Sequence, residues 1–192
     1  MTNPLLDRVL PAEMADRSQV IEYKGKVGDF ERLVAIVEED LEASSEDRRR
    51  REWQAAPVDV RLEFDWVDAR REIPLAKGLV SARLTVVCQR CLEAFEMPLE
   101  ATIRMMLVDT EAGDGNFAKL AACADLEIWE LEEETLRPLD MIEESLIMAM
   151  PLAPMHESQD FCGPLARNIV EETSGTIRPF ADLGSLLKRQ TD

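Results

Sequence analysis

Basic residues are scarce in this 192-residue chain. Its 22 lysine and arginine residues are outnumbered by 39 aspartate and glutamate residues, which gives a formal net charge of −17. A surface this acidic is, taken as a whole, repelled by nucleic-acid phosphates and by anionic membranes. The charge therefore excludes a protein that coats nucleic acid along its whole surface, but it leaves a localised contact open.

Long apolar runs are also missing, because charged residues interrupt every apolar stretch well before the roughly 20 residues needed to span a bilayer. The first 18 residues lack the basic start and apolar centre of a signal peptide. The eight glycines are scattered and form no phosphate-binding loop. We expect a cytoplasmic protein that makes no membrane contact.

The residues that are present are typical of one globular domain. Hydrophobic residues make up 46% of the chain and charged residues 32%, a balance that argues against wholesale disorder. A length of 192 residues favours a single domain. Residues 1–18 contain Pro4 and Pro11 and little periodicity, so we expect a flexible N-terminal arm followed by one domain over residues 19–192.

Hydrophobic periodicity predicts both strands and helices. Apolar residues recur with a period of two, which is typical of half-exposed strands in an antiparallel sheet, and the expected strands cover residues 19–26, 58–66, 80–88 and 95–107. From Phe30 to Leu41 the apolar positions follow a helical spacing, and Asp29 is placed to cap that helix. A second helix ends at Pro151, with Asp140 and Glu143 as the expected capping pair.

These elements predict an α+β fold in which an antiparallel sheet with one long hairpin is packed by two or three helices. The hairpin turn begins at Cys88 and includes Cys91. Three weaker patterns complete the prediction: a mobile excursion over residues 109–124, a short strand near residues 126–129 and a last short helix beginning at Pro179.

Four residues have the chemistry of a metal site. Two cysteines two residues apart in a tight turn can hold one tetrahedral ion, so Cys88 and Cys91 read as half of a structural zinc site. His156, the chain's single histidine, and Cys162 lie in a loop after a predicted helix and can supply the other half. The set is Cys₃His, a closed structural geometry with no position left for a substrate.

Other interpretations of these residues stay open at this point. Free cysteines are often simply buried, and a lone histidine is often a hydrogen-bonded structural residue. A redox pair at Cys88 and Cys91 is disfavoured, because a thioredoxin-like motif opens a helix, whereas here strand follows strand. A nucleophilic Cys162–His156 pair needs an orienting third group that nothing in the sequence identifies. We expect no chemical role for Cys123.

Any nucleic-acid contact should use the first half of the chain. Residues 1–99 contain 15 basic and 20 acidic residues, whereas residues 100–192 contain 7 and 19. The candidate contact residues are all arginines: Arg48, Arg49, Arg50, Arg51, Arg70 and Arg71. Acidic residues flank the run of four, so a solvated loop is the simpler interpretation of it.

Three sequence blocks carry a resemblance to a known family. They are VVCQRCLEAFEMPLE at residues 86–100, LDMIEESLIMAMPLAPMHESQDFC at 139–162 and RPFADLGSLLKR at 178–189. In this order they resemble the YceD family, the large ribosomal RNA subunit accumulation proteins of bacteria and plastids. Arg178 stands where the family's tail has asparagine. Residues 1–70 match the family only in pattern.

The resemblance implies a non-enzymatic factor for accumulation or processing of 23S rRNA and for assembly of the large ribosomal subunit. The family pattern also contains the four candidate metal ligands Cys88, Cys91, His156 and Cys162, so the resemblance favours a structural zinc ion as cofactor. The expected partner is a large-subunit precursor or a basic ribosomal protein, with a local rRNA contact at the arginines. The alternatives are an acidic chaperone or adaptor for a basic ribosomal protein, and a thiol-dependent enzyme.

Overall fold

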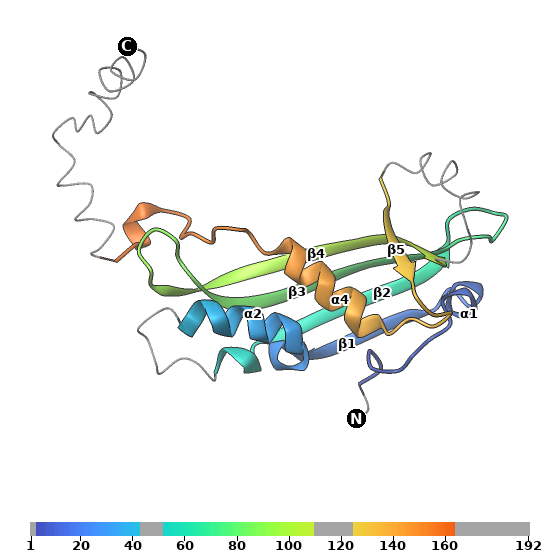
Figure 1. The fold of residues 1–192 in the computed structure, drawn as a ribbon, viewed down its shortest axis with the longest axis horizontal. Coiled ribbons are helices and arrows are strands. Elements are labelled where there is room, and N and C mark those ends of the chain that lie inside the picture. Colours follow the sequence, from blue (N-terminus) through green and yellow to red (C-terminus); the bar gives the residue numbers. More distant parts are fainter. Residues whose placement is uncertain (1–2, 43–51, 110–124, 164–192) are drawn as a thin grey trace, which may run out of the picture.

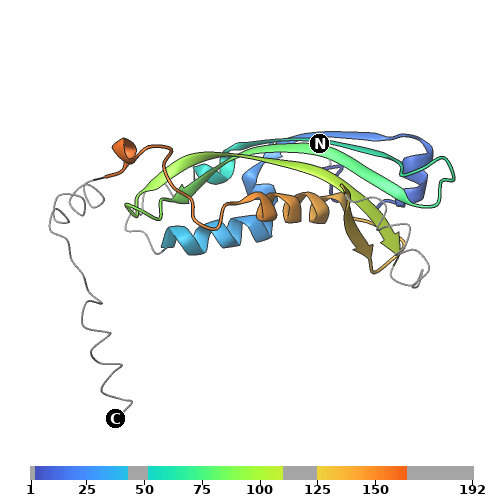
Figure 2. The ribbon, with the colours of Figure 1, turned by 90° about the horizontal axis from the view of Figure 1, so that it is seen from above.

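A computed structural model of the chain describes residues 3–42, 52–109 and 125–163 (Figure 1). The expected last short helix and the four clustered arginines from Arg48 to Arg51 fall outside these ranges. The expected excursion over residues 109–124 also falls outside them, except for Asp109. Within them, the molecule is a curved sheet that arcs over two helices (Figure 2). The predicted α+β fold is confirmed.

Five strands form one sheet in the order β1-β2-β3-β4-β5. They are β1 (Val20–Lys26), β2 (Pro57–Trp66), β3 (Pro74–Val87), β4 (Ala94–Asp109) and β5 (Glu127–Leu131). The first four pair antiparallel, and β3 and β4 form the long predicted hairpin. Strand β5 pairs parallel to the last five residues of β4, so the preceding residues of β4, Ala94–Arg104, pair only with β3 among the residues described.

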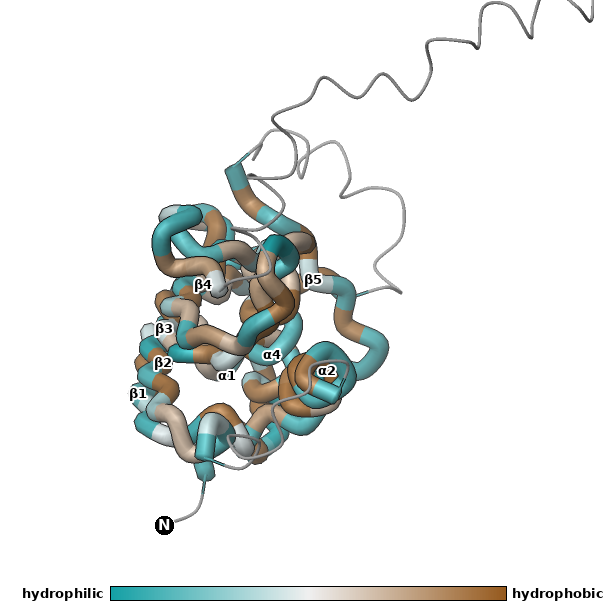
Figure 3. Tube along the Cα trace, turned by 90° about the vertical axis from the view of Figure 1, so that its left-hand side faces the viewer, coloured by the Kyte–Doolittle hydropathy of each residue, from teal (hydrophilic) through white to brown (hydrophobic). Residues whose placement is uncertain are grey.

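The helices lie on one face of this sheet. Helices α2 (Glu31–Glu42) and α4 (Pro138–Ala149) lie side by side beneath the strands, as the end view in Figure 3 shows. The alternate apolar residues of β2, from Val58 to Phe64, point into this layer and are almost entirely buried, whereas Asp59 and Arg61 face away from it. The period-two pattern of the sequence thus divides the sheet into a covered face and an open face. None of the described helices is long and apolar enough to cross a membrane.

The N-terminal segment differs from the predicted arm, because it packs on the core. Residues Pro11–Asp16 form the short helix α1, in which Met14 and Ala15 are buried. Leu5 has no exposed surface, and Val9 forms an isolated bridge with Leu136. These scattered apolar contacts have no helical or strand period, which is why the sequence pattern alone suggests an arm.

The predicted helix caps are wrong, and the actual contacts join the two helices. Asp29 accepts hydrogen bonds from the Lys26 N–H (2.9 Å) and the Tyr23 hydroxyl (2.7 Å), so its carboxylate stabilises the turn before α2. The first turn of α2 is bonded instead by Glu143 of α4. Its carboxylate accepts from the N–H groups of Arg32 (2.7 Å) and Leu33 (3.2 Å).

Glu143 is therefore not part of a capping pair at the start of its own helix. There, Asp140 instead forms an ion pair with Arg137, and Pro138 occupies the first turn. Only 3% of the Glu143 surface is exposed, because the side chain lies between α4 and α2. Free N–H groups at a helix start attract a carboxylate, which explains why a buried acid is tolerated at this contact.

Candidate metal centre

The turn between β3 and β4 positions the first two candidate ligands. The N–H of Cys88 donates to the Glu93 carbonyl (2.9 Å), and the Cys88 carbonyl accepts from the Leu92 N–H (2.8 Å). Leu92 has a φ of 59°, a left-handed conformation that is uncommon for a residue with a side chain at Cβ. This tight turn brings Cys91 back toward Cys88, as the Cys-x-x-Cys spacing predicts.

The other two candidate ligands come from the segment that follows α4. The Gln89 N–H donates to the Pro154 carbonyl (2.9 Å), and the Arg90 guanidinium donates to the His156 carbonyl. Pro154 is buried beneath this contact. We call residues 88–93 and 151–162 together the clasp, because they join the hairpin turn to a segment more than 60 residues away.

A short 3₁₀ turn places Cys162 within the clasp. Residues Gln159–Phe161 form this turn, and the Ser158 hydroxyl caps it by accepting from the Asp160 N–H (3.2 Å). The next residue, Cys162, is almost completely buried. A local hydroxyl cap therefore fixes the position of a cysteine that the sequence pattern leaves in an undefined loop.

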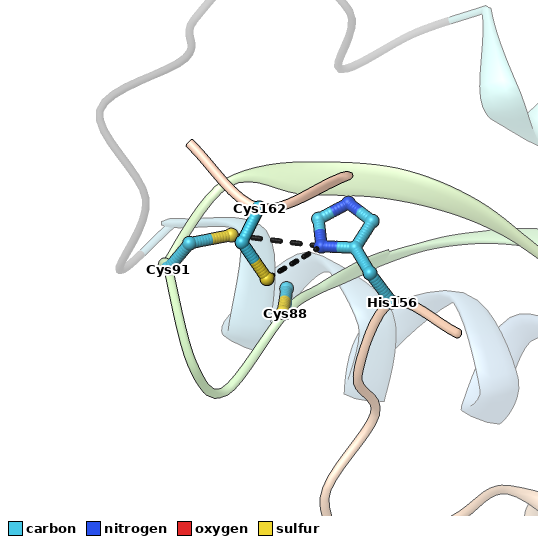
Figure 4. Close-up of side chains that lie close together, drawn as sticks. All are labelled: Cys88, Cys91, His156 and Cys162. Carbon is cyan, nitrogen blue, oxygen red and sulfur yellow. Dashed lines mark hydrogen bonds between the residues drawn. The ribbon is translucent and has the colours of Figure 1, made fainter. Parts of the chain in front are cut away.

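The four candidate ligands converge. One ligand atom from each of Cys88, Cys91, His156 and Cys162 lies within 4.8 Å of all the others. The His156 Nδ1 atom is 3.6 Å from the Cys91 sulfur and 3.6 Å from the Cys162 sulfur, as the dashed lines in Figure 4 show. The three cysteines are free thiols, each with 1% or less of its surface exposed.

These distances fit a tetrahedral zinc ion. With Zn–S near 2.3 Å and Zn–N near 2.0–2.1 Å, tetrahedral angles place a sulfur and a nitrogen ligand about 3.6 Å apart. The two observed sulfur–nitrogen separations of 3.6 Å match this spacing. Three sulfurs and one imidazole nitrogen are also a donor set that zinc prefers.

The protonation states of the cysteines point in the same direction. Burial by itself raises the pKa of the Cys88 thiol. Backbone N–H groups of His156, Arg90 and Cys91 donate to its sulfur and outweigh burial, which lowers the pKa to about 6. The lowered pKa favours the thiolate of Cys88, which is the form that binds metal.

Cys162 behaves in the opposite way. Burial, together with hydrogen bonds to Cys91 and Cys88, raises the pKa of the Cys162 thiol to about 11. Two adjacent buried sulfurs do not both ionise readily without a nearby positive charge. A divalent cation would supply that charge, so the chemistry of the cluster is compatible with a metal site.

Sequence reasoning missed one residue that supports the site, the aromatic residue Phe95. The ring of Phe95 lies 4.4 Å from the ring of His156, between centroids, at an angle of 38°. Phe95 also contacts the three buried cysteines, so it shields one side of the cluster. In the sequence Phe95 is one apolar residue among several alternating in a strand, and nothing distinguishes it from its neighbours.

The candidate nucleic-acid residues lie elsewhere. Arg70 and Arg71 are exposed in the β2–β3 connection, at the end of the sheet opposite the clasp. Arg71 forms an ion pair with Asp16 of α1 at 3.4 Å. The Arg70 N–H donates to the Asp68 carboxylate. The structure therefore does not bring these arginines to the metal centre.

Known proteins resemble this chain over the region that contains the clasp. The model of a family described as "Large ribosomal RNA subunit accumulation protein YceD" matches residues 76–187. A Haemophilus influenzae protein of that same name is 32% identical over 140 residues, which cover 68% of this chain and 74% of the relative. No solved structure matches the chain. The family match extends over more than half of the chain and includes all four candidate ligands, so the chain belongs to the YceD family.

Proposed function

We propose that this protein is a non-enzymatic factor of the cytoplasm that promotes accumulation and processing of 23S rRNA during assembly of the large ribosomal subunit. The observation that carries the proposal is family membership over residues 76–187. The Haemophilus influenzae relative bears the name of a large ribosomal RNA subunit accumulation protein. The immediate binding partner is an assembling large-subunit particle.

We further propose that the clasp holds a structural zinc ion. When bound, zinc supplies a fourfold cross-link between two distant parts of the chain, and it leaves no coordination position open for a substrate. The chain's own contribution is the preformed ligand cluster. The Gln89–Pro154 backbone hydrogen bond and the Phe95 ring orient the ligands before the metal arrives.

The closed geometry is the reason to prefer a structural over an enzymatic role. A thiol enzyme using Cys162 and His156 needs a nucleophile that substrate can reach. Here the Cys162 sulfur lies close to the imidazole and to the other two sulfurs. Only 1% of the surface of Cys162 is exposed. Its raised pKa also keeps it in the unreactive thiol form.

A second candidate function is supported by the charge of the helices. Helices α2 and α4 contain eight acidic residues, of which only Glu143 is buried, and one basic residue, a formal charge of −7. Such a surface attracts lysine- and arginine-rich proteins through complementary charge. An acidic adaptor that holds a basic ribosomal protein away from the ribosome is therefore the alternative to a factor bound to the particle.

Sedimentation separates these functions. We would fractionate a lysate on a sucrose gradient and follow the protein by immunoblotting, with mature large subunits as the reference. The proposed function predicts co-sedimentation with immature large-subunit particles, and depletion of the protein should lower 23S rRNA relative to 16S rRNA. Recovery only at the top of the gradient, in a complex with one basic protein, would favour the adaptor.

A further inference from the structure

The open face of the sheet is a second surface that the clasp does not use. It consists of the alternate residues of β1–β4 that point away from the helices. The strand register places them in rows across the sheet, of which one is Lys26, Pro57, Arg83 and Pro98 and another is Glu63, Lys77 and Arg104. The open face has no helix over it among the described elements, as Figure 2 shows.

This face is electrically unlike the rest of the molecule. Between Val20 and Arg104 it contains six acidic and six basic side chains, so its formal charge is zero in a chain of −17. The basic ones are Lys24, Lys26, Arg61, Lys77, Arg83 and Arg104, and the acidic ones are Glu22, Asp59, Glu63, Asp65, Glu96 and Glu100.

The acidic helices do not repel a ligand that approaches the open face. They carry −7 on the opposite side of the sheet. A helix layer packs about 10 Å from the sheet, and at physiological salt exposed charges are screened over about 8 Å. A ligand on the open face therefore interacts mainly with the balanced charges of that face.

Three of the basic side chains are free to meet a ligand. Lys24, Arg61 and Lys77 have carboxylate partners on the same face, at Asp59, Glu22 and Asp65 respectively. Among the described residues, Lys26, Arg83 and Arg104 have no carboxylate within ion-pair distance, and all three are exposed.

The arrangement of these three cations is set by the register. Lys26 and Arg83 are two strands apart in a row that has no acidic residue, a separation of about 10 Å. Arg104 lies opposite Lys77, six residues along β3 from Arg83, or about 20 Å. Lys77 is already paired with Asp65 at 3.3 Å, so Arg104 is the cation of this row that has no carboxylate partner among the described residues.

We infer that the open face binds the phosphate backbone of RNA through Lys26, Arg83 and Arg104. The inference rests on the proposed function, because an assembling large subunit is the source of the RNA. Three hydroxyl-bearing residues lie on the same face and add neutral hydrogen-bond donors: Thr102, which is exposed, and Ser81 and Thr85, which are half-buried. The contact thus lies on the sheet rather than at Arg70 and Arg71.

The composition of the face favours RNA over a protein partner. Stable protein interfaces have an apolar centre that is depleted in charge. Here, among the described residues, Leu79 and Val20 are the exposed large apolar side chains of the face, beside twelve charged ones. Polar, wet and arginine-containing surfaces are typical of nucleic-acid interfaces.

The test measures RNA binding by fluorescence anisotropy over a salt series, with a labelled oligouridine as the probe. The open-face variant is Lys26→Gln/Arg83→Gln/Arg104→Gln. The control Arg8→Gln/Arg17→Gln/Arg71→Gln removes the same charge from exposed positions near α1, where each loses only a surface ion pair. Circular dichroism and thermal melting establish that both variants are folded.

We expect the open-face variant to bind the probe at least about ten-fold more weakly than the wild type. The slope of log K against log salt should become less negative by about 2, as expected for three lost phosphate contacts. The control should bind like the wild type. The substitution Glu96→Gln/Glu100→Gln, which removes negative charge beside Arg83, should strengthen binding.

Three outcomes would overturn the inference: no binding by the wild type, equal weakening in both triple variants, or an open-face variant that binds RNA normally yet leaves the immature particles. The last result would assign the face to a protein partner. Each leaves the proposed function standing if the wild type still sediments with those particles. The proposed function fails separately if the wild type does not sediment with them.

Discussion

The core and the clasp of this protein are held together by different forces. Among the residues that the structure describes, the core buries thirty apolar side chains in one continuous cluster between the sheet and the helices, so its stability comes from apolar surface removed from water. The clasp buries three cysteines with Phe95 beside them, too little apolar surface to fix two distant segments. The comparison separates a region stabilised mainly by apolar burial from a region whose contacts depend on cysteine protonation and, in our proposal, on metal.

The largest effect is expected from removing one clasp ligand. Cys162→Ser should weaken zinc binding by about a thousand-fold or more, because three ligands hold the ion far less well than four. Residues 151–162 should then be cut by protease while the core stays folded. Zinc content and limited proteolysis measure this, with Cys123→Ser as the control that keeps its metal. Global unfolding of Cys162→Ser would instead show that core and clasp are one cooperative unit.

The converse experiment disturbs the core alone. Phe64 has no exposed surface and lies on the covered face of β2. Phe64→Ala should lower the free energy of unfolding by about 3–5 kcal/mol through lost burial and a cavity. Urea denaturation measures the change, and the folded fraction should still bind zinc. Leu79→Ala on the open face is the matched control, with a change of less than about 1 kcal/mol expected. Equal losses at the two positions would contradict the assignment of the covered and open faces.

A smaller effect is expected at the contact between the helices. Glu143→Ala leaves the N–H groups of Arg32 and Leu33 without their acceptor, so it should destabilise the core by about 1–3 kcal/mol. Glu144→Ala removes only the exposed ion pair with Arg32 and should cost less than about 1 kcal/mol. Comparable urea midpoints for the two variants would refute a special role for the buried carboxylate.

The smallest expected effect on stability comes from ionisation of Tyr23 at alkaline pH. Burial, together with the hydrogen bond to Asp29 and the negative charge of Asp29, raises the pKa of Tyr23 to about 12. Since the folded-state pKa is above the ordinary value of 10, this group stabilises the core below pH 10, and the contribution is lost as the pH rises through 12. Tyr23 is the only tyrosine, so its phenolate absorbance reports the titration directly. Titration near pH 10 would contradict the contact.

Much of the fold follows from the sequence because the strands are long and half exposed. The alternation from Val58 to Trp66 predicts β2 to within one residue, and the alternation on both sides of Cys88 and Cys91 predicts the hairpin. The start of β3 at Pro74 is six residues earlier than expected, because Pro74 and Gly78 obscure the pattern. The parallel pairing of β5 depends on a chain path that local sequence does not encode.

The four candidate ligands could be predicted from the sequence, but the residues that position them could not. Cysteine and histidine are rare here and chemically distinctive, so the four candidate ligands stand out, and the structure brings them together. The zinc assignment itself stays a prediction. The Gln89–Pro154 hydrogen bond joins a backbone N–H to a backbone carbonyl, groups that do not distinguish these residues from most others. Glu143 is equally undetectable, since it is one of 39 acidic residues and its partners are N–H groups of another helix.

The unpaired stretch of β4 bears on the solubility of the protein. Residues Ala94–Arg104 pair with β3 alone in the described part of the chain, so they present a strand edge to which a second copy could add. Pro98 lies in the middle of this stretch and has no N–H to donate, and the charged side chains of Glu96 and Glu100 flank it. A proline between two like charges interrupts the ladder that edge-to-edge aggregation requires. The free edge of the long hairpin therefore carries two features that oppose strand addition, a proline and flanking charges.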